Sequence, residues 1–318
     1  TVATGCRLHF GLLAGGGTDG PRFGGAGVML DSPAVELALE SADHGSVSGA
    51  PPARSRVEQF VALYRDRCPA EHVPRACRIE VRRAIPPHAG LGSGTQLGLA
   101  VARGLSALGG ESAVPAAELA RRVGRGTRSA IGIYGFEHGG FLVDAGKLDR
   151  QAIGTLAARL PFPAAWRFVL VTPPDDAGLS GPAERAAFRQ LPPMSPAVIA
   201  ELGRFLSHEL QPAVAGVEFE RAGEALFQFN RRVGELFAAI QGGVYASPRM
   251  AQLAGRLRAE GVRGVGQTSW GPTLFALVAS QTAAENLIKR LHDDGSCAGC
   301  AIRVSRPKND PARVVAER

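Results

Sequence analysis

Residues 86–100, which read PPHAGLGSGTQLGLA, constrain the fold more than any other stretch of the chain. The run follows an apolar segment typical of a strand and continues into apolar residues at helical spacing. Glycines allow a backbone to approach a ligand closely, and the free amides at the start of a helix attract anions. The run therefore predicts a phosphate-binding loop, although a plain turn with a serine or threonine helix cap would give a similar pattern. The residues expected to bind phosphate are Gly90, Gly92, Ser93, Gly94, Thr95 and Gln96.

The chain on both sides of this loop alternates between strand-like and helix-like segments. Short apolar runs broken by glycine predict strands at 6–13, 27–31, 35–39, 77–82 and 141–144. Apolar residues at helical spacing predict helices at 57–67, 94–108 and 115–122. We expect these helices to pack on a sheet built from the strands.

The second half of the chain repeats this alternation with longer helices. Strands are expected at 167–172, 273–278 and 301–304, and helices at 197–210, 218–240, 249–260 and 282–293. The end, 307–318, is expected to be frayed. The pattern predicts an α+β protein of two domains, with the phosphate loop in 1–160 and an α+β C-terminal domain in 161–318.

The charge of the chain points to acidic ligands rather than to nucleic acid. The formal net charge is +7, but the basic residues are dispersed, and no basic run contains interleaved aromatic residues. No segment approaches the roughly 18 uncharged apolar residues that a membrane span requires. We therefore expect a soluble, cytoplasmic protein that acts on phosphorylated small molecules, with no nucleic-acid or membrane partner.

Three further segments have the composition of ligand-binding motifs. Residues 264–277, GVGQTSWGPTLFAL, place a glycine-rich loop before an apolar strand, and residues 7–13 and 22–28 read RLHFGLL and RFGGAGV. With the phosphate loop, these segments resemble the kinase superfamily of galactokinase, homoserine kinase and mevalonate kinase. Within it they resemble the branch of the β-ribofuranosylaminobenzene 5′-phosphate synthases. The resemblance spans most of the chain and implies the GHMP kinase-like fold, with a ribosomal protein S5 domain 2-like N-terminal domain and a ferredoxin-like C-terminal domain.

One segment departs from the kinases of that superfamily. Residues 128–132, RSAIG, align with the kinase sequence Gly-Ser-Gly-Ile-Asp, so Gly132 occupies the position of the aspartate. Glycine can neither accept a proton nor orient an acceptor hydroxyl, which argues against phosphoryl transfer. Two alternatives remain open: an ATP-dependent small-molecule kinase, which ATP turnover would reveal, and a non-catalytic phosphate-ester-binding protein on the same scaffold.

The synthase resemblance implies a decarboxylating phosphoribosyl transfer. In that reaction 4-aminobenzoate condenses with 5-phosphoribosyl 1-pyrophosphate and releases CO2 and pyrophosphate, in tetrahydromethanopterin biosynthesis, usually with Mg²⁺. The same residues suit a hydroxybenzoate acceptor equally well. Mg²⁺ needs only one or two protein carboxylates, for which Asp19, Asp31, Glu137 and Asp144 are unranked candidates. Family habit also implies a possible homodimer.

The expected catalytic residues are Arg7, His9 and His88. Arg7 and His9 stand two residues apart on a predicted strand and so share one face, which suits a polar pocket, although His9 alone could be a core histidine. His88, beside the phosphate loop, is a candidate for pyrophosphate contact or proton transfer, or else an exposed loop histidine. The resemblance adds Arg22 and Arg128 to the phosphate-binding set. It also implies a substrate-binding set of Gly25, Gly266, Gln267, Thr268, Ser269 and Trp270. Trp270 and Phe23 are candidates to stack on the acceptor ring, although aromatic residues of this kind more often belong to the packing.

Overall fold

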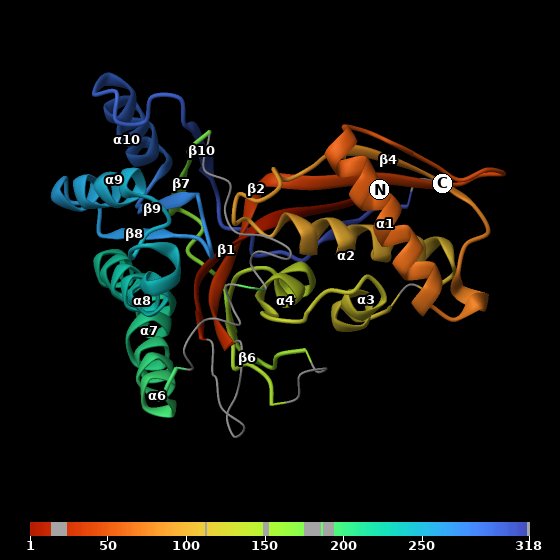
Figure 1. Ribbon diagram of the computed structural model, residues 1–318, viewed down its shortest axis with the longest axis horizontal. Helices are drawn as coiled ribbons and strands as arrows, with labels where there is room; N and C mark the ends of the chain where they lie inside the picture. Colours follow the sequence, from red (N-terminus) through yellow and green to blue (C-terminus); the bar gives the residue numbers. More distant parts are fainter. Residues whose placement is uncertain (14–23, 112, 149–152, 175–185, 187–193, 317–318) are drawn as a thin grey trace.

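The computed structural model describes residues 1–13, 24–111, 113–148, 153–174, 186 and 194–316. These residues form two units side by side, each a β-sheet covered by helices (Figure 1). The predicted α+β class is therefore confirmed. None of the helices in the described ranges is long and apolar enough to cross a membrane.

The first unit is built on a seven-stranded sheet in the order β11-β1-β2-β4-β3, with β5 paired to β2 and β6 paired to β5. Every pair is antiparallel except β3 with β4. The prediction of separate strands at 27–31 and 35–39 is wrong, because one extended strand runs from Gly24 to Ser41 and its pairing with β1 only shifts register between Leu30 and Val35. The strands are β1 (Val2–Leu13), β2 (Gly24–Ser41), β3 (Ser46–Ser48), β4 (Cys77–Arg83), β5 (Phe141–Asp144), β6 (Leu156–Leu160) and β11 (Arg313–Val314).

Helices cover one face of this sheet. They are α1 (Pro51–Arg67), α2 (Ser93–Leu108), α3 (Ala116–Arg122) and α4 (Ile131–His138), with a 3₁₀ turn at Ala70–His72. The α2 helix is central, and it contacts β1 and β2 as well as α1, α3 and α4. Leu97, Val101 and Leu105 form its buried face, as their helical spacing predicted. The α1 helix begins at Pro51 rather than Val57, because proline is tolerated in a first turn, where no amide partner is needed.

The second unit is a four-stranded antiparallel sheet in the order β10-β7-β9-β8. Its strands are β7 (Arg167–Thr172), β8 (Gly264–Gln267), β9 (Leu274–Val278) and β10 (Ala301–Ser305). Its helices are α6 (Pro196–Phe205), α7 (Gln211–Ala215), α8 (Phe219–Gln241), α9 (Pro248–Ala259) and α10 (Gln281–Asp293), and a π-helical turn at Leu206–Leu210 joins α6 to α7. The predicted helix at 197–210 thus changes to π geometry in its last turn.

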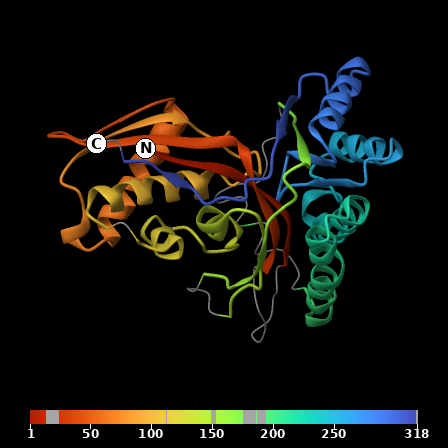
Figure 2. The same cartoon turned by 180° about the vertical axis from the view of Figure 1, so that it is seen from behind.

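The two units share one continuous core because side chains alternate between the faces of β7 and β9. On β7, Phe168 points into the core shared with the first unit, whereas Val169 points into a separate core beneath α9 and α10. Phe10 of β1 lies 6.3 Å from Phe168 and 5.5 Å from Phe275 between ring centroids. The α8 helix packs on both β1 and β8, which closes the junction (Figure 2). The β1 strand therefore carries Arg7 and His9 to the boundary between the units.

The C-terminal segment returns to the first sheet. Arg313 and Val314 form β11, which pairs with the start of β1, and the N-terminal ammonium of Thr1 donates to the carbonyl of Val315 over 2.7 Å. Both ends of the chain accordingly lie at the same end of the molecule (Figure 1). The prediction of a frayed end at 307–318 is wrong for Arg313 and Val314. Their backbone groups pair with the start of β1, and the sequence pattern does not identify this pairing.

Candidate functional site

The predicted phosphate loop joins β4 to the start of α2. Gly90 and Gly92 have φ angles of +75° and +73°, a left-handed geometry that glycine adopts without strain. Gly92 is the N-cap of α2, and no side chain caps the helix, which rules out the plain serine or threonine cap considered above. The amides of Thr95 and Gln96 donate to the Gly92 carbonyl over 3.1 Å each. The amides of the two residues before them begin the helix, where no intrahelical acceptor exists, so they can bind an anion.

Three guanidinium groups surround this first turn. Arg56 on α1 donates to the Ser93 hydroxyl over 3.4 Å, and Arg125 donates to the Thr95 hydroxyl over 3.3 Å. A Cβ built on Gly94 would lie 2.5 Å from Nη2 of Arg56 and 3.1 Å from Nη2 of Arg125. Arg7 approaches from β1 and donates to the Gly90 carbonyl over 2.9 Å. The start of α2 is thus a concentrated positive region in which phosphate oxygens would find both amides and guanidinium groups.

The glycine-rich loop between β8 and β9 supports the phosphate loop from the second unit. The hydroxyl of Thr268 donates to the Gly90 carbonyl over 3.0 Å and accepts the backbone amide of His9 over 2.9 Å. The amide of Ser269 donates to the His9 carbonyl over 3.1 Å. His88 and Ser269 are two of the three described non-glycine residues with positive φ, and one lies in each loop. Strained backbone of this kind is retained where the surrounding structure fixes it, often at a ligand site.

His9 is buried, with 2% of its surface exposed, and lies between the two loops. Its Nε2 lies 2.9 Å from the hydroxyl of Ser129, which accepts the amide of Ile131 over 3.2 Å. No described residue pairs with its Nδ1. Burial, together with the charge of Arg7, lowers the pKa of His9 well below its usual range, so the imidazole is neutral. His9 is therefore a core residue whose buried Nδ1 retains its hydrogen-bonding capacity.

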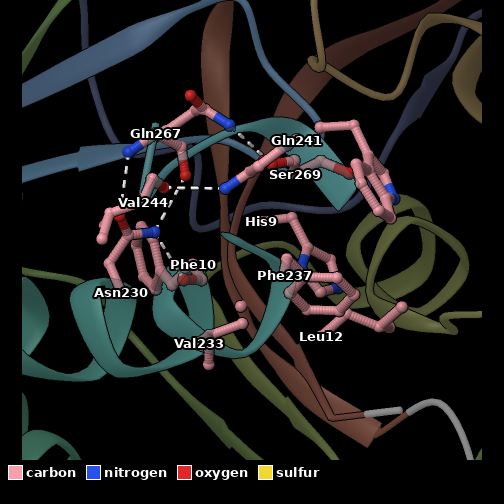
Figure 3. A pocket seen from close by; sticks show the side chains of 13 residues that line it. His9, Phe10, Leu12, Asn230, Val233, Phe237, Gln241, Val244, Gln267 and Ser269 are labelled. Atoms are coloured by element: carbon pink, nitrogen blue, oxygen red, sulfur yellow. Dashed lines mark hydrogen bonds between the residues drawn. The ribbon is translucent and has the colours of Figure 1, made fainter. Parts of the chain in front are cut away.

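A small cavity of about 40 Å³ lies beside His9, between β1, α8 and the second glycine loop (Figure 3). Phe237 and Gln241 of α8 line it together with Ser269. The ring of Trp270 packs edge-on against Phe237, with 5.0 Å between centroids, and Trp270 is only 8% exposed. A cavity of about 150 Å³ is needed to hold benzene, so this one has room for water but not for an aromatic ring.

Gly132 lies where α4 meets the first turn of α2. The side-chain amide of Gln96, which is fully buried, donates to the Gly132 carbonyl over 2.7 Å and accepts the Thr4 hydroxyl over 2.8 Å. A Cβ on Gly132 would lie 3.2 Å from Cγ2 of Thr95 and 3.4 Å from Nε2 of Gln96. A side chain at position 132 would therefore require Thr95 and Gln96 to shift by a few tenths of an ångström, so the glycine suits the tight packing at this position.

The remaining expected site residues lie at different distances from His9 and the phosphate loop. Gly25 lies against His9, since its Cβ would be 3.1 Å from Cε1 of the imidazole. Asn230 on α8 holds Gln267 in place, because the side-chain oxygen of Asn230 accepts a hydrogen bond from the backbone amide of Gln267 over 2.9 Å. Arg128 is half-buried just before α4, beside the serine that contacts His9. Arg22 lies outside the described residues.

Of the four carboxylates considered for magnesium, two have other partners. Asp31 accepts hydrogen bonds from the side chain and amide of Arg306, each over 2.9 Å. Asp144 is buried and accepts two backbone amides. Glu137 is half-buried in the last turn of α4, and Asp19 lies outside the described residues. Within the described ranges, no cluster of three or more His, Cys, Asp or Glu side chains could hold a metal.

Asp144 fixes the segment that positions Ser129. Its two oxygens accept the amides of Ala130, over 2.7 Å, and of Gly146, over 2.9 Å. Burial nevertheless raises its pKa from 3.8 to about 6. A carboxyl with a raised pKa binds more protons in the folded state, so its contribution to stability is present below about pH 4 and is lost as the pH rises through about 6.

We therefore expect a pH-dependent stability difference between the wild type and Asp144→Asn. The free energy of unfolding of the wild type, taken relative to the variant, should fall by up to about 3 kcal/mol between about pH 4 and pH 7, because the shift is about 2 pKa units. Urea titrations across this range would measure it. A difference that stays constant or grows with pH would contradict the expected pKa direction.

Comparison with known proteins places the chain among characterised sequences. Residues 55–140 match the GHMP kinases N terminal domain, and residues 199–297 match the GHMP kinases C terminal domain. The beta-ribofuranosylphenol 5′-phosphate synthase of Methanothermobacter thermautotrophicus is 30% identical over 293 residues, which cover 87% of this chain and 88% of that protein. The protein of the same name from Archaeoglobus fulgidus is 30% identical over 97% of both chains.

Solved structures of low sequence identity share the fold. Streptococcus pneumoniae phosphomevalonate kinase superposes with a TM-score of 0.69 at 14% identity, covering 96% of this chain and 98% of that one. Streptococcus pyogenes mevalonate pyrophosphate decarboxylase superposes with a TM-score of 0.66 at 13% identity, covering 97% and 96%. The expected GHMP kinase-like two-domain fold is confirmed.

Proposed function

Because the chain belongs to the family of the beta-ribofuranosylphenol 5′-phosphate synthases, we propose that it joins the ribosyl group of 5-phosphoribosyl 1-pyrophosphate to a para-substituted benzoate, releasing CO2 and pyrophosphate. The observation that carries this proposal is the positive first turn of α2, which lies next to a glycine where a kinase would need a carboxylate. That turn suits a pyrophosphate group, whereas Gly132 provides no carboxylate that could serve as a phosphoryl-transfer base.

The phosphate loop and the arginines bind the donor. The pyrophosphate lies over the amides of Ser93 and Gly94, with the hydroxyls of Ser93 and Thr95 and the guanidinium groups of Arg56 and Arg125 around it. Gln96 supports the loop from below, because its side chain bonds Gly132. The 5′-phosphate is a second anion, for which Arg22 and Arg128 are the proposed partners.

The chemistry requires positioning and charge rather than a covalent intermediate on the protein. The ring carbon that bears the carboxylate forms a bond to the ribosyl carbon of the donor. At the same time the bond between the ribosyl carbon and the pyrophosphate oxygen breaks, and its electron pair stays on that oxygen. The bond between ring and carboxyl carbons then breaks, CO2 leaves, and the pair restores the aromatic ring. Arg7 and His88 stabilise the negative charge that develops on the departing pyrophosphate. The closed junction between the units excludes water from the cation-like ribosyl carbon.

The para substituent drives the attack by donating electrons into the ring. The relatives are named for a phenol product, whereas the sequence resemblance suggested 4-aminobenzoate. A para hydroxyl donates more strongly as it loses its proton. Neutral His9, which Ser129 fixes between the two loops, is proposed to act as a hydrogen-bonding group that keeps the site positioned. The loop at residues 266–270 acts by holding His9 and Gly90 in place.

The proposal also covers the role of Mg²⁺, the cellular compartment and the oligomeric state of the protein. Mg²⁺ would neutralise charge on the pyrophosphate, and the hydroxyls of Ser93 and Thr95 would be the protein oxygens available to it in the first turn of α2. Action in the cytoplasm, in tetrahydromethanopterin biosynthesis, and assembly as a homodimer belong to the same proposal.

A substrate panel tests the proposed reaction. We expect purified protein with Mg²⁺ and phosphoribosyl pyrophosphate to release pyrophosphate only when 4-hydroxybenzoate or 4-aminobenzoate is added, and not with unsubstituted benzoate, which lacks a donating group. With ATP in place of the donor, no acceptor should stimulate ADP formation. Acceptor-dependent ADP formation with homoserine, mevalonate or a sugar would indicate a kinase instead. Saturable binding of the donor without any turnover would indicate a binding protein.

A further inference from the structure

A second pocket, of about 170 Å³, opens beside the phosphate loop on the side of α1. Its walls are apolar and include Pro52, Ala53, Ile85, Pro86 and Leu97. The polar side chains that reach it belong to Arg56 of α1 and to Ser93, the first residue of α2, and the two are in contact. An apolar cavity of about 150 Å³ binds benzene, so this pocket has the size for one aromatic ring, unlike the cavity beside His9.

Arg56 marks the mouth of this pocket as an anion site. Its guanidinium is half-buried, and burial lowers its pKa because a charged group loses hydration there. Its described contact is with the Ser93 hydroxyl, over 3.4 Å, and no carboxylate of the described residues forms an ion pair with it. The buried Arg122 of the same unit, by contrast, pairs with Glu111 over 2.5 Å. A partly desolvated cation without a counter-charge, at the open end of an apolar pocket, suits a ligand with an apolar body and an anionic end.

We propose that this pocket holds the aromatic ring of the benzoate acceptor, with the carboxylate end at Arg56 and Ser93. The inference rests on the proposed synthase function and specifies where the acceptor binds. Because Ser93 belongs to both sites, the carboxylate-bearing carbon lies next to the ribosyl carbon of a donor whose pyrophosphate occupies the start of α2. The para substituent then points toward the apolar wall formed by α1 and residues 84–87, and the pocket recognises the ring and carboxylate more than the substituent.

Filling the pocket tests the proposal. Ala53 is a buried alanine on the wall of the pocket, so Ala53→Leu extends a side chain into the space meant for the ring. We expect this variant to raise the KM for 4-hydroxybenzoate by about tenfold or more, with the donor KM within about twofold of the wild type, because overpacking acts only on the ring. Arg56→Gln should weaken acceptor binding by a similar factor and should also weaken donor binding, because its guanidinium borders the proposed pyrophosphate site. The matched controls are Ala62→Leu and Arg54→Gln, which alter exposed positions of the same helix and should leave both constants unchanged.

Equilibrium binding separates this inference from the proposed function. Calorimetric titration with 4-hydroxybenzoate, with the donor's product pyrophosphate present, should show saturable binding to the wild type that Ala53→Leu abolishes, whether or not turnover is seen. If the wild type binds 4-hydroxybenzoate in this way but shows no turnover, the synthase function is contradicted and the ring site is still supported. Unchanged acceptor affinity in folded Ala53→Leu, or no benzoate binding to the wild type, would overturn the ring site. If Trp270→Ala alone raised the acceptor KM, the ring would belong beside His9 instead.

Discussion

Valine in place of Gly92 should lower the affinity for phosphoribosyl pyrophosphate by at least about hundredfold while the two units stay folded. Gly92 caps α2 at φ +73°, a conformation that a β-branched residue adopts only under strain. A Cβ at this position would also lie 2.7 Å from Cγ of Arg7, so the arginine would have to leave its place over the loop. Calorimetric titration of the donor measures the loss directly.

Gly110 provides a matched control for this variant. It follows the C-terminal end of α2 with φ +84°, and no atom lies within 4 Å of the place its Cβ would take. Gly110→Val therefore carries a similar backbone strain without disturbing the phosphate loop. If Gly92→Val binds the donor as tightly as Gly110→Val does, and both are folded, residues 86–96 are a structural turn and the donor binds elsewhere.

Removing the side chain of Arg7 should lower kcat/KM by about 100-fold to 1000-fold, which is the usual loss when one preorganised charge-stabilising donor is removed. Arg7 lies on β1 and donates to the Gly90 carbonyl over 2.9 Å, which places its guanidinium beside the loop that holds the pyrophosphate. Arg7→Lys should recover little activity, because an ammonium lacks the planar fork of a guanidinium. Steady-state kinetics with the donor varied would measure both variants.

The Arg7 prediction also needs a measure of stability. Arg78→Gln on β4 removes an exposed arginine whose ion pair with Glu40 should matter little, and it serves as the control. The melting temperatures of Arg7→Ala and Arg78→Gln should lie close together, whereas only the first loses turnover. A low melting temperature with full activity per folded molecule would assign Arg7 a purely structural role.

The sequence predicts those parts of the site that local patterns determine. The glycine spacing before α2 predicts a loop that enters a helix with free amides, and the alternation along β1 places Arg7 and His9 on one strand near it. Arg56 was missed because its contribution depends on how α1 crosses the start of α2, which no local pattern encodes. The contact of Trp270 with Phe237, from a distant helix, is likewise a product of tertiary packing.

The fold shows the same division between local and long-range information. Helices with a clear apolar face, such as α2, begin and end within a residue of the predicted limits. The continuous β2 and the returning β11 were missed, because strand extent depends on partners far away in the chain. Gly132 is the exception, because this single residue predicted chemistry different from that of the kinases. In the structure its carbonyl accepts a hydrogen bond from the side chain of Gln96.

The release of CO2 from the acceptor tests the central claim most directly. Carboxyl-labelled 4-hydroxybenzoate and 4-aminobenzoate should lose their label as CO2 only when phosphoribosyl pyrophosphate is present, in equal amount to the pyrophosphate released and faster with Mg²⁺. A carbon–carbon bond at the carboxyl-bearing carbon requires this loss, whereas ribosylation on the para nitrogen or oxygen would retain the label. Label release without the donor would indicate a simple decarboxylase, and pyrophosphate release with retained label would indicate N- or O-ribosylation; either result would contradict the synthase assignment.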